Sequence, residues 1–165
     1  MGKARASGGQ GTPATVAAAK AAITFTLHPY EPDAAADSYG EAAADALGVP
    51  YEQIFKTLLT EVDGRLTVAV VPVAATLDLK ALAAATGGKR ARMADPATAE
   101  RSTGYVVGGI SPLGQRRRLP TVVDSSASGF ATIYVSAGRR GLQIELAPAD
   151  LIRLTSGLAA GIARS

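Results

Sequence analysis

The sequence predicts a mixed α+β domain with a largely antiparallel sheet and helices inserted between its strands. Short segments alternate apolar and polar residues, as half-buried strands do. These segments lie close together along the chain, and Asp63-Gly64 between two of them is a strong hairpin signal. Ala-rich runs preceded by capping residues predict short helices between the strands.

Helices are expected where a proline or a capping residue precedes an Ala-rich or apolar run. Pro13 suits the first turn of the first helix. The capping-box pattern from Ser38 to Glu41 begins a second helix, which stops at Gly48, and Asp95-Pro96 begins a later one. The predicted helices span residues 13–21, 38–48, 78–86, 95–103 and a terminal one that begins at 148–154, with a single helical turn at Pro50.

Strands are expected where alternating segments are bounded by turn signals. The segment from Ile23 to His28 is followed by a polar loop from Pro29 to Asp37. A glycine-rich loop runs from Tyr105 to Leu113, and Gly138 to Gly141 forms the last turn. The predicted strands span residues 23–28, 55–60, 65–71, 89–93, 119–123, 130–135 and 142–146.

Length and composition fit one domain. The chain has 165 residues, of which 47% are hydrophobic and 19% are charged. Residues 1–12 are expected to form a flexible leader, and residues 13–165 the domain. The leader has no apolar segment typical of a secretory signal, and no apolar run approaches the ~20 residues of a membrane helix. We therefore expect a soluble intracellular domain.

The residue types that are missing narrow the chemistry. The chain has no cysteine, which excludes a disulfide framework, a thiolate nucleophile of the protein and zinc sites with Cys ligands. Its single histidine, His28, excludes a His-rich metal site. The carboxylates show no pair at a spacing typical of a metal or glycosidase site. We expect no metal.

Charge is distributed unevenly along the chain. Residues 1–64 carry four Lys or Arg against eight Asp or Glu, and residues 65–165 carry thirteen against six. The basic excess, which includes the run from Arg116 to Arg118, favours a polyanionic partner on one face, although solvated surface arginines are the commoner explanation of any one cluster. Aromatic residues are only 5%, so contacts to a nucleic acid would be made mainly to its backbone.

Two local features could carry chemistry. Lys56 lies within an apolar strand segment, where desolvation would lower its pKa, but from the pattern alone a lysine extending from a sheet edge into water is favoured. The segment from Gly108 to Pro112 could aim backbone N–H groups at an oxyanion or a phosphate, although a tight turn is the simpler interpretation. Nothing marks the hydroxyls of Thr57, Ser111 and Ser136 as activated nucleophiles.

Several stretches form a collinear pattern from about Pro13 to the C-terminus. They are 55–59, 95–96 with 100–105, 108–115, 118–121 and 131–142. In order, spacing and combination they resemble the YbaK/EbsC family of aminoacyl-tRNA editing proteins, relatives of the insertion editing domain of bacterial prolyl-tRNA synthetase. The block from Arg101 to Gln115 is most similar to the Cys-tRNA(Pro) deacylase branch, with the Ala-tRNA(Pro) deacylase branch as the close competitor. The resemblance implies a barrel-like, largely antiparallel sheet surrounded by helices.

The resemblance also implies an activity and a set of site residues. It implies a cytoplasmic deacylase that removes cysteine from proline tRNA, needs no cofactor and works in a transient complex with prolyl-tRNA synthetase. Lys56 matches the lysine that the family needs for activity, and Gln143 stands where some relatives have Asp. The residues expected to bind the substrate are Tyr30, Tyr39, Thr57, Gly108, Gly109, Ile110, Ser111, Pro112, Ser136 and Gln143. Those expected to bind tRNA are Arg116, Arg117, Arg118 and Arg139.

In this family's chemistry the substrate brings its own nucleophile, because the cysteinyl thiol can attack its own ester and leave as a cyclic thiolactone. Nearby positive charge would raise the thiolate fraction of a thiol whose ordinary pKa is ~8.5. Backbone N–H groups from Gly108 to Ser111 are expected to contact the oxyanion, and Lys56 to hold a phosphate or favour the thiolate. Two hypotheses stay open beside it: a water-using deacylase for another mischarged tRNA such as Ala-tRNA(Pro), and a non-catalytic module that binds tRNA or a synthetase.

Overall fold

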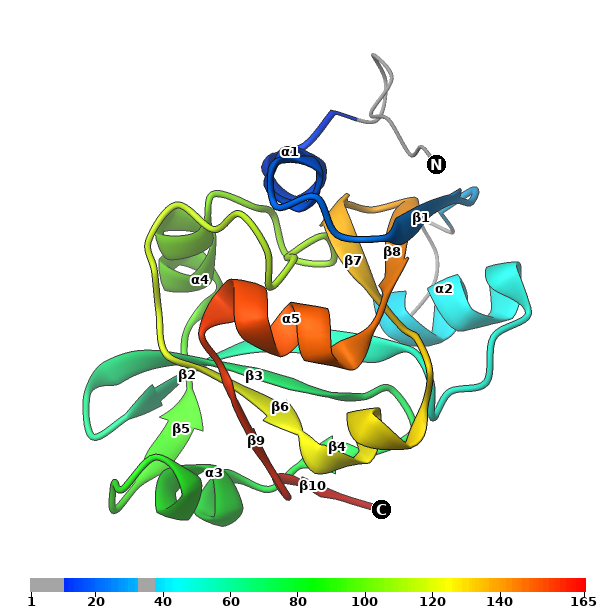
Figure 1. The fold of residues 1–165 in the computed structure, drawn as a ribbon. Helices are drawn as coiled ribbons and strands as arrows, with labels where there is room; N and C mark the ends of the chain where they lie inside the picture. The colour runs from blue at the N-terminus through cyan, green and yellow to red at the C-terminus, as the bar shows by residue number, and fades with distance from the viewer. Residues whose placement is uncertain (1–10, 33–37) are drawn as a thin grey trace.

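The computed structural model describes residues 11–32 and 38–165, and its helices and strands alternate along the chain (Figure 1). The helices are α1 (Pro13–Lys20), α2 (Tyr39–Leu47), α3 (Leu79–Ala85), α4 (Pro96–Thr103) and α5 (Pro148–Thr155), with a 3-10 helix η2 (Ser125–Gly129). The strands are β1 (Phe25–Pro29), β2 (Phe55–Val62), β3 (Arg65–Pro72), β4 (Thr76–Leu77), β5 (Ala91–Met93), β6 (Thr121–Asp124), β7 (Ile133–Arg139), β8 (Leu142–Leu146), β9 (Leu158–Ala160) and β10 (Ala163–Arg164). The predicted mixed α+β class is confirmed.

The strands form two main sheets and one short pair. The larger sheet has the order β5-β2-β3-β6-β9, and the smaller has the order β1-β8-β7. Strands β2 and β3 form the predicted hairpin, whose turn places Asp63 and Gly64 at φ 50° and 83°. The smaller sheet is antiparallel throughout, whereas β6 pairs in parallel with both β3 and β9. Most pairings are therefore antiparallel, as predicted.

Both main sheets contribute their apolar faces to one core. Phe55 and Val70 come from the larger sheet, and Ile144 comes from the smaller sheet. Leu151 of α5 is fully buried in the same cluster. A second cluster covers the other face of the larger sheet, where Leu82 of α3 is fully buried. In Figure 1, α3 accordingly lies at the lower edge of the molecule, away from α1 and the smaller sheet.

The helix starts follow the predicted capping chemistry. The side chains of Thr12, Ser38, Asp78 and Asp95 each accept a hydrogen bond from the third residue of the helix that follows. Thr12 also donates its hydroxyl to the carbonyl of Ala137, so the last residue of the expected leader is tied to β7. The leader up to residue 10 lies outside the described residues, as does most of the predicted polar loop before α2.

One expectation differs from the observed fold. The helix at residue 148 is not terminal, because β9 and β10 follow it and pair with β6 and β4. Both strands are very short, and their partners lie far away in the sequence, so no local pattern marks them. The two main sheets pack around a shared core, so barrel-like describes their arrangement loosely, and the described strands form no closed barrel. No helix in the described part of the chain has the length and apolarity to cross a membrane.

Candidate active site

A pocket of about 400 Å³ lies between the larger sheet, the smaller sheet and the first turn of α2. Its wall is mostly apolar and carries a few polar groups, as small-molecule sites usually do. The loop after α4 closes one side, and the segment from β5 to α4 closes another. The lining residues that recur below are Tyr39, Lys56, Thr57, Met93, Val107, Gly108, Ile110, Ser136 and Gln143.

Lys56 brings the positive charge of the pocket. It lies on β2 opposite Val71 of β3 and is half-buried. Within the described residues its ammonium forms no ion pair. Burial lowers its pKa, and the carboxylate of Glu41 opposes that effect only in part. An unpaired, partly desolvated ammonium of this kind is suited to receive an anionic group of a ligand.

Two polar atoms of the pocket wall are buried without a hydrogen-bond partner. They are Oγ1 of Thr57 on β2 and Oε1 of Gln143 on β8. Gln143 is only 6% exposed, and its cross-strand neighbour on β7 is Ser136, another lining residue. An unpaired buried polar atom lowers the stability of a fold by about 1–3 kcal/mol. Such atoms beside a pocket therefore indicate that a bound ligand forms the missing hydrogen bonds.

The glycine-rich loop supplies backbone groups to the same pocket. The N–H of Gly109 donates to the carbonyl of Val106 at 2.9 Å, which makes a turn. The amides of Gly108 and Ile110 donate no hydrogen bond within the described part of the chain, and both residues line the pocket. Of the N–H groups from Gly108 to Ser111 that are expected to contact the oxyanion, those of Gly108 and Ile110 are therefore the two that are free in the described chain and belong to lining residues.

Four of the expected substrate-binding residues lie outside the pocket lining. Gly109 uses its N–H in the turn and packs on the backbone of Arg139. Ser111 is fully buried, and its Oγ accepts from the N–H of Leu113. Pro112 contacts a hollow beside α1, and Tyr30 packs against a cluster that includes Ile54. Their expected roles stay predictions.

Arg140, which the sequence analysis did not assign to the site, borders the pocket. Its guanidinium donates twice to the carbonyl of Val107, from Nε at 3.0 Å and from Nη2 at 2.6 Å. Cζ of the same guanidinium lies over the ring of Tyr39, 4.5 Å from the ring centroid. Only the adjacent Arg139 is assigned a role from the sequence, and only the fold shows the contacts of Arg140.

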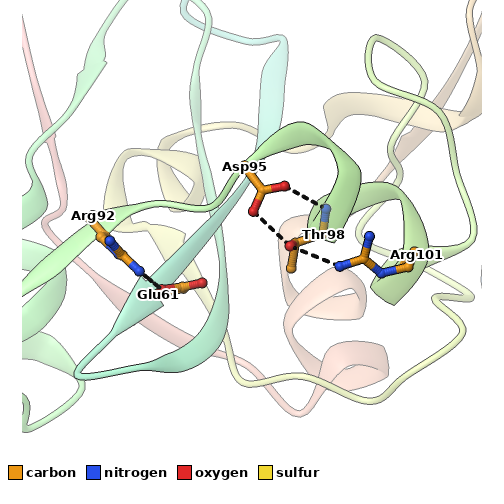
Figure 2. A network of polar contacts seen from close by, with 5 residues as sticks. All are labelled: Glu61, Arg92, Asp95, Thr98 and Arg101. Carbon is orange, nitrogen blue, oxygen red and sulfur yellow. Dashed lines mark hydrogen bonds and ion pairs between the residues drawn. The ribbon is translucent and has the colours of Figure 1, made fainter.

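The start of α4 is fixed by polar contacts beside the pocket (Figure 2). Asp95 accepts from the N–H and the hydroxyl of Thr98, and Arg101 donates to the same hydroxyl at 3.3 Å. The hydrogen bonds from Thr98 hold the pKa of Asp95 below its ordinary value. Figure 2 also shows Arg92 of β5 bound to Glu61 of β2, a contact that ties the two strands together.

Three of the predicted tRNA-binding arginines, Arg116 to Arg118, lie at the C-terminal ends of α4 and α5, and the fourth, Arg139, lies at the end of β7. Arg116 and Arg117 are exposed, and their backbone N–H groups donate to the backbone carbonyls of Thr103 and Ser102. Arg118 donates to the hydroxyl of Ser156 at 2.6 Å. None of these three, nor Arg139, forms an ion pair within the described residues. The exposed guanidinium groups of Arg116, Arg117 and Arg118 are therefore available to a polyanion, whereas Nε of Arg139 is buried without a hydrogen-bond partner.

Known proteins resemble this chain in sequence and in fold. A family model described as an aminoacyl-tRNA editing domain matches residues 33–154. EbsC of Enterococcus faecalis, named as a candidate Cys-tRNA(Pro)/Cys-tRNA(Cys) deacylase, is 45% identical over 120 residues, which cover 71% of this chain and 72% of that protein. ProXp-y of Escherichia coli, named a multifunctional Ser/Thr-tRNA deacylase, is 31% identical over 119 residues, which cover 69% and 71%.

Among solved structures, a candidate trans-editing enzyme for prolyl-tRNA synthetase matches with a TM-score of 0.74 at 25% identity, covering 86% of this chain and 87% of that one. A hypothetical protein of known structure matches with a TM-score of 0.82 at 25% identity, covering 93% and 100%. The family model covers well over half of the chain, and the relatives are matched over about 70% of their length. The chain therefore belongs to the aminoacyl-tRNA editing domain family and is an aminoacyl-tRNA editing enzyme.

Proposed function

We propose that this enzyme works in the cytoplasm as a trans-acting deacylase that removes cysteine from Cys-tRNA(Pro), with Cys-tRNA(Cys) as a further substrate. The observation that carries the proposal is the pocket itself. It presents the unpaired Lys56 ammonium, the unpaired Thr57 and Gln143 oxygens and two free backbone N–H groups. The 45% identity to a protein named for cysteine removal supports the same substrate.

The pocket wall offers binding groups but no activated attacking group. Its described lining contains no histidine and no carboxylate, and its hydroxyls have no hydrogen bond to a base. A serine or threonine needs such a base to become a nucleophile. The substrate is therefore the better source of the nucleophile, and a cysteinyl ester carries a thiol.

In the proposed reaction the substrate sulfur bonds to its own ester carbon. The bond from that carbon to the ribose oxygen then breaks, the ribose oxygen takes up the thiol proton, and a cyclic thiolactone leaves. Holding the sulfur against the ester carbon can remove roughly 7–11 kcal/mol of the barrier. An N–H donor aimed at the oxyanion adds about 3 kcal/mol.

Lys56 has two candidate roles in this scheme. Its ammonium could hold the phosphate of the terminal nucleotide, or it could stabilise the substrate thiolate. The lowered pKa of Lys56 does not separate the two, because both need the protonated form. Both roles therefore predict that activity is lost as the pH rises, with a midpoint below the ordinary pKa of a lysine.

The arginines at the ends of α4 and α5, together with Arg139 at the end of β7, are proposed to contact the tRNA backbone. Arg116, Arg117, Arg118 and Arg139 are free of ion pairs in the described chain, as a surface that binds phosphates requires. A transient complex with prolyl-tRNA synthetase would deliver the mischarged tRNA. The structural match to a candidate trans-editing enzyme for that synthetase supports this partner.

A second candidate function is a water-using deacylase for another mischarged tRNA. The 31% identity to a protein named a Ser/Thr-tRNA deacylase favours it. In that reaction Gly108 and Ile110 would bind the oxyanion in the same way, but a water held in the pocket would attack. A substrate without a thiol would then be cleaved.

The two functions are separated by a panel of Cys-, Ser-, Thr- and Ala-tRNA(Pro), measured with and without prolyl-tRNA synthetase. The thiol mechanism predicts fast release of cysteine and slow release of the others. Equal rates on all four would contradict it and favour the water-using enzyme. Failure to release any amino acid, with tRNA binding retained, would favour a non-catalytic binding module.

A further inference from the structure

The carbonyl of the peptide unit between Val107 and Gly108 is held by one charged side chain, and the preceding peptide unit is held by another. Two hydrogen bonds from Arg140 fix the carbonyl of Val107. The N–H of Val107 donates to Oε2 of Glu100 at 2.8 Å, so the same residue is held from α4 as well. The contacts from Arg140 join the turn between β7 and β8 to the loop after α4, and the contact from Glu100 joins that loop to α4 itself.

The orientation of this peptide determines where the N–H of Gly108 points. The described chain contains no cis peptide bond, so the C=O and the N–H of one unit point in opposite directions. Since the carbonyl of Val107 faces Arg140, the N–H of Gly108 faces away from it. Gly108 lines the pocket, and its N–H has no acceptor within the described residues.

Arg140 also polarises that peptide. A cationic donor on a carbonyl withdraws electron density from the amide, which makes the N–H of the same unit a stronger donor. The guanidinium forms no ion pair with a carboxylate of the described chain, so its charge is not neutralised nearby. Its position over the ring of Tyr39 limits the directions in which it can move.

The position of Gly108 is adapted to this arrangement. Its φ of +92° lies in the region that favours glycine. A Cβ at Gly108 would stand 2.6 Å from Nε of Arg140 and 3.0 Å from the ring of Tyr39. The close approach of Arg140 to the peptide therefore requires glycine at this position.

We propose that Arg140 is a positioning residue for the editing reaction, which orients and polarises the Val107–Gly108 peptide so that the N–H of Gly108 binds the oxyanion formed at the ester carbonyl. The proposal rests on the proposed deacylase function, but it applies to any aminoacyl ester in the pocket. It does not depend on whether sulfur or water attacks.

The test compares Arg140→Ala and Arg140→Lys with Arg153→Lys, a matched substitution at an exposed arginine of α5. Single-turnover rates are measured at saturating enzyme, and the Kd for tRNA(Pro) is measured separately. We expect Arg140→Ala to lower the rate about tenfold to a hundredfold with Kd changed less than about twofold. Arg140→Lys should fall between Arg140→Ala and wild type, and Arg153→Lys should match wild type.

Two readouts separate this role from a merely structural one. Added methylguanidinium should restore part of the rate of Arg140→Ala, which a general loss of folding would not allow. The amide proton of Gly108 should move upfield in the NMR spectrum of Arg140→Ala and stay in place in Arg153→Lys. The NMR readout needs no substrate, so it tests the proposal even if wild-type enzyme leaves Cys-tRNA(Pro) intact, a result that would overturn only the proposed function.

Several outcomes would overturn the proposal. One is an Arg140→Ala enzyme with an unchanged rate and an unchanged Gly108 amide shift. Another is a loss confined to Kd together with a weaker dependence on salt, which would make Arg140 a contact to tRNA phosphate. A third is a lower rate that methylguanidinium does not restore, with no change at Gly108.

Discussion

Gln143 and Glu145 stand two residues apart on β8 and face the same side of the smaller sheet, yet their surroundings differ. The Glu145 carboxylate shares a hydrogen bond of 2.8 Å with Nε2 of His28 and accepts another from the hydroxyl of Thr132. Oε1 of Gln143 is buried and receives no hydrogen bond in the protein. The protein itself supplies hydrogen-bond donors to Glu145, whereas Oε1 of Gln143 is free to accept a hydrogen bond from a ligand.

The contrast separates stability from function along one strand. A polar group that the protein itself satisfies adds to the free energy of unfolding, whereas an unsatisfied one subtracts from it. Thr57 shares the unsatisfied state of Gln143, Lys56 forms no ion pair within the described residues, and all three line the same pocket. We therefore expect changes at these three residues to affect activity, and changes at Glu145 to affect stability.

The largest expected effect is at Lys56. Lys56→Ala should lower kcat/KM by about 100-fold or more, because a charged contact to the substrate is lost. The free energy of unfolding should stay the same or rise, since a partly desolvated charge is removed. Steady-state deacylation and urea unfolding measure the two quantities. Lys80→Ala, at an exposed lysine on α3, is the control, and full activity of Lys56→Ala would contradict a catalytic pocket.

A smaller effect is expected from the two unpaired oxygens. Thr57→Val and Gln143→Leu should each lower kcat/KM about tenfold and leave stability unchanged or raised, because an unpaired buried polar atom is replaced by an apolar group. Thr60→Val is the matched control on β2, since the hydroxyl of Thr60 donates to the carbonyl of Thr67 at 2.8 Å. It should lower stability and retain activity. The reverse pattern in the two threonine variants would refute the distinction.

Glu145→Gln should lower the stability of the protein and leave its activity nearly unchanged. Loss of the charged acceptor for His28 and Thr132 is expected to cost about 1–2 kcal/mol of unfolding free energy, a fall of several degrees in Tm. Deacylation at a temperature where both proteins are folded should stay within about twofold of wild type. A variant of wild-type stability with a much lower rate would place Glu145 in the site instead.

The smallest expected effect is a pH dependence of stability. Burial favours the neutral acid at Glu145, but hydrogen bonds from Thr132 and His28 outweigh it and hold the pKa below its ordinary value. Since a lowered carboxyl pKa stabilises the fold only while the group is ionised, this contribution is lost as the pH falls below about 4.3. Urea unfolding of wild type and Glu145→Gln over that range should show a gap that closes toward acid. A constant gap would assign the stability to packing.

Much of the fold follows from local sequence signals. Ser38, Asp78 and Asp95 predict helix starts because a cap acts within one turn, and Asp63-Gly64 predicts a hairpin because a tight turn needs positive φ. The parallel strand β9 was missed because three residues carry no pattern of their own and their partner is remote. The larger elements were predictable because their signals lie within them.

Site residues could be predicted from the sequence only where they belong to a motif of the family. The resemblance pointed to Lys56, Gly108 and Gln143, which the fold brings into one pocket. It could not show that Ser111 turns into the core three residues after Gly108. Nor could it show that Arg140 bonds to Val107, because that contact joins residues 33 positions apart. Such facts depend on packing between elements and need the structure.

The most direct measurement replaces the substrate's sulfur and leaves its shape nearly unchanged. 2-Aminobutyryl-tRNA(Pro) carries a methyl group where Cys-tRNA(Pro) carries the thiol, so the two esters should bind alike. If cysteine's own sulfur attacks, single-turnover release of 2-aminobutyrate should be at least about 100-fold slower than release of cysteine at equal tRNA affinity. Equal release of both amino acids would show that the attacking group comes from water or from the protein.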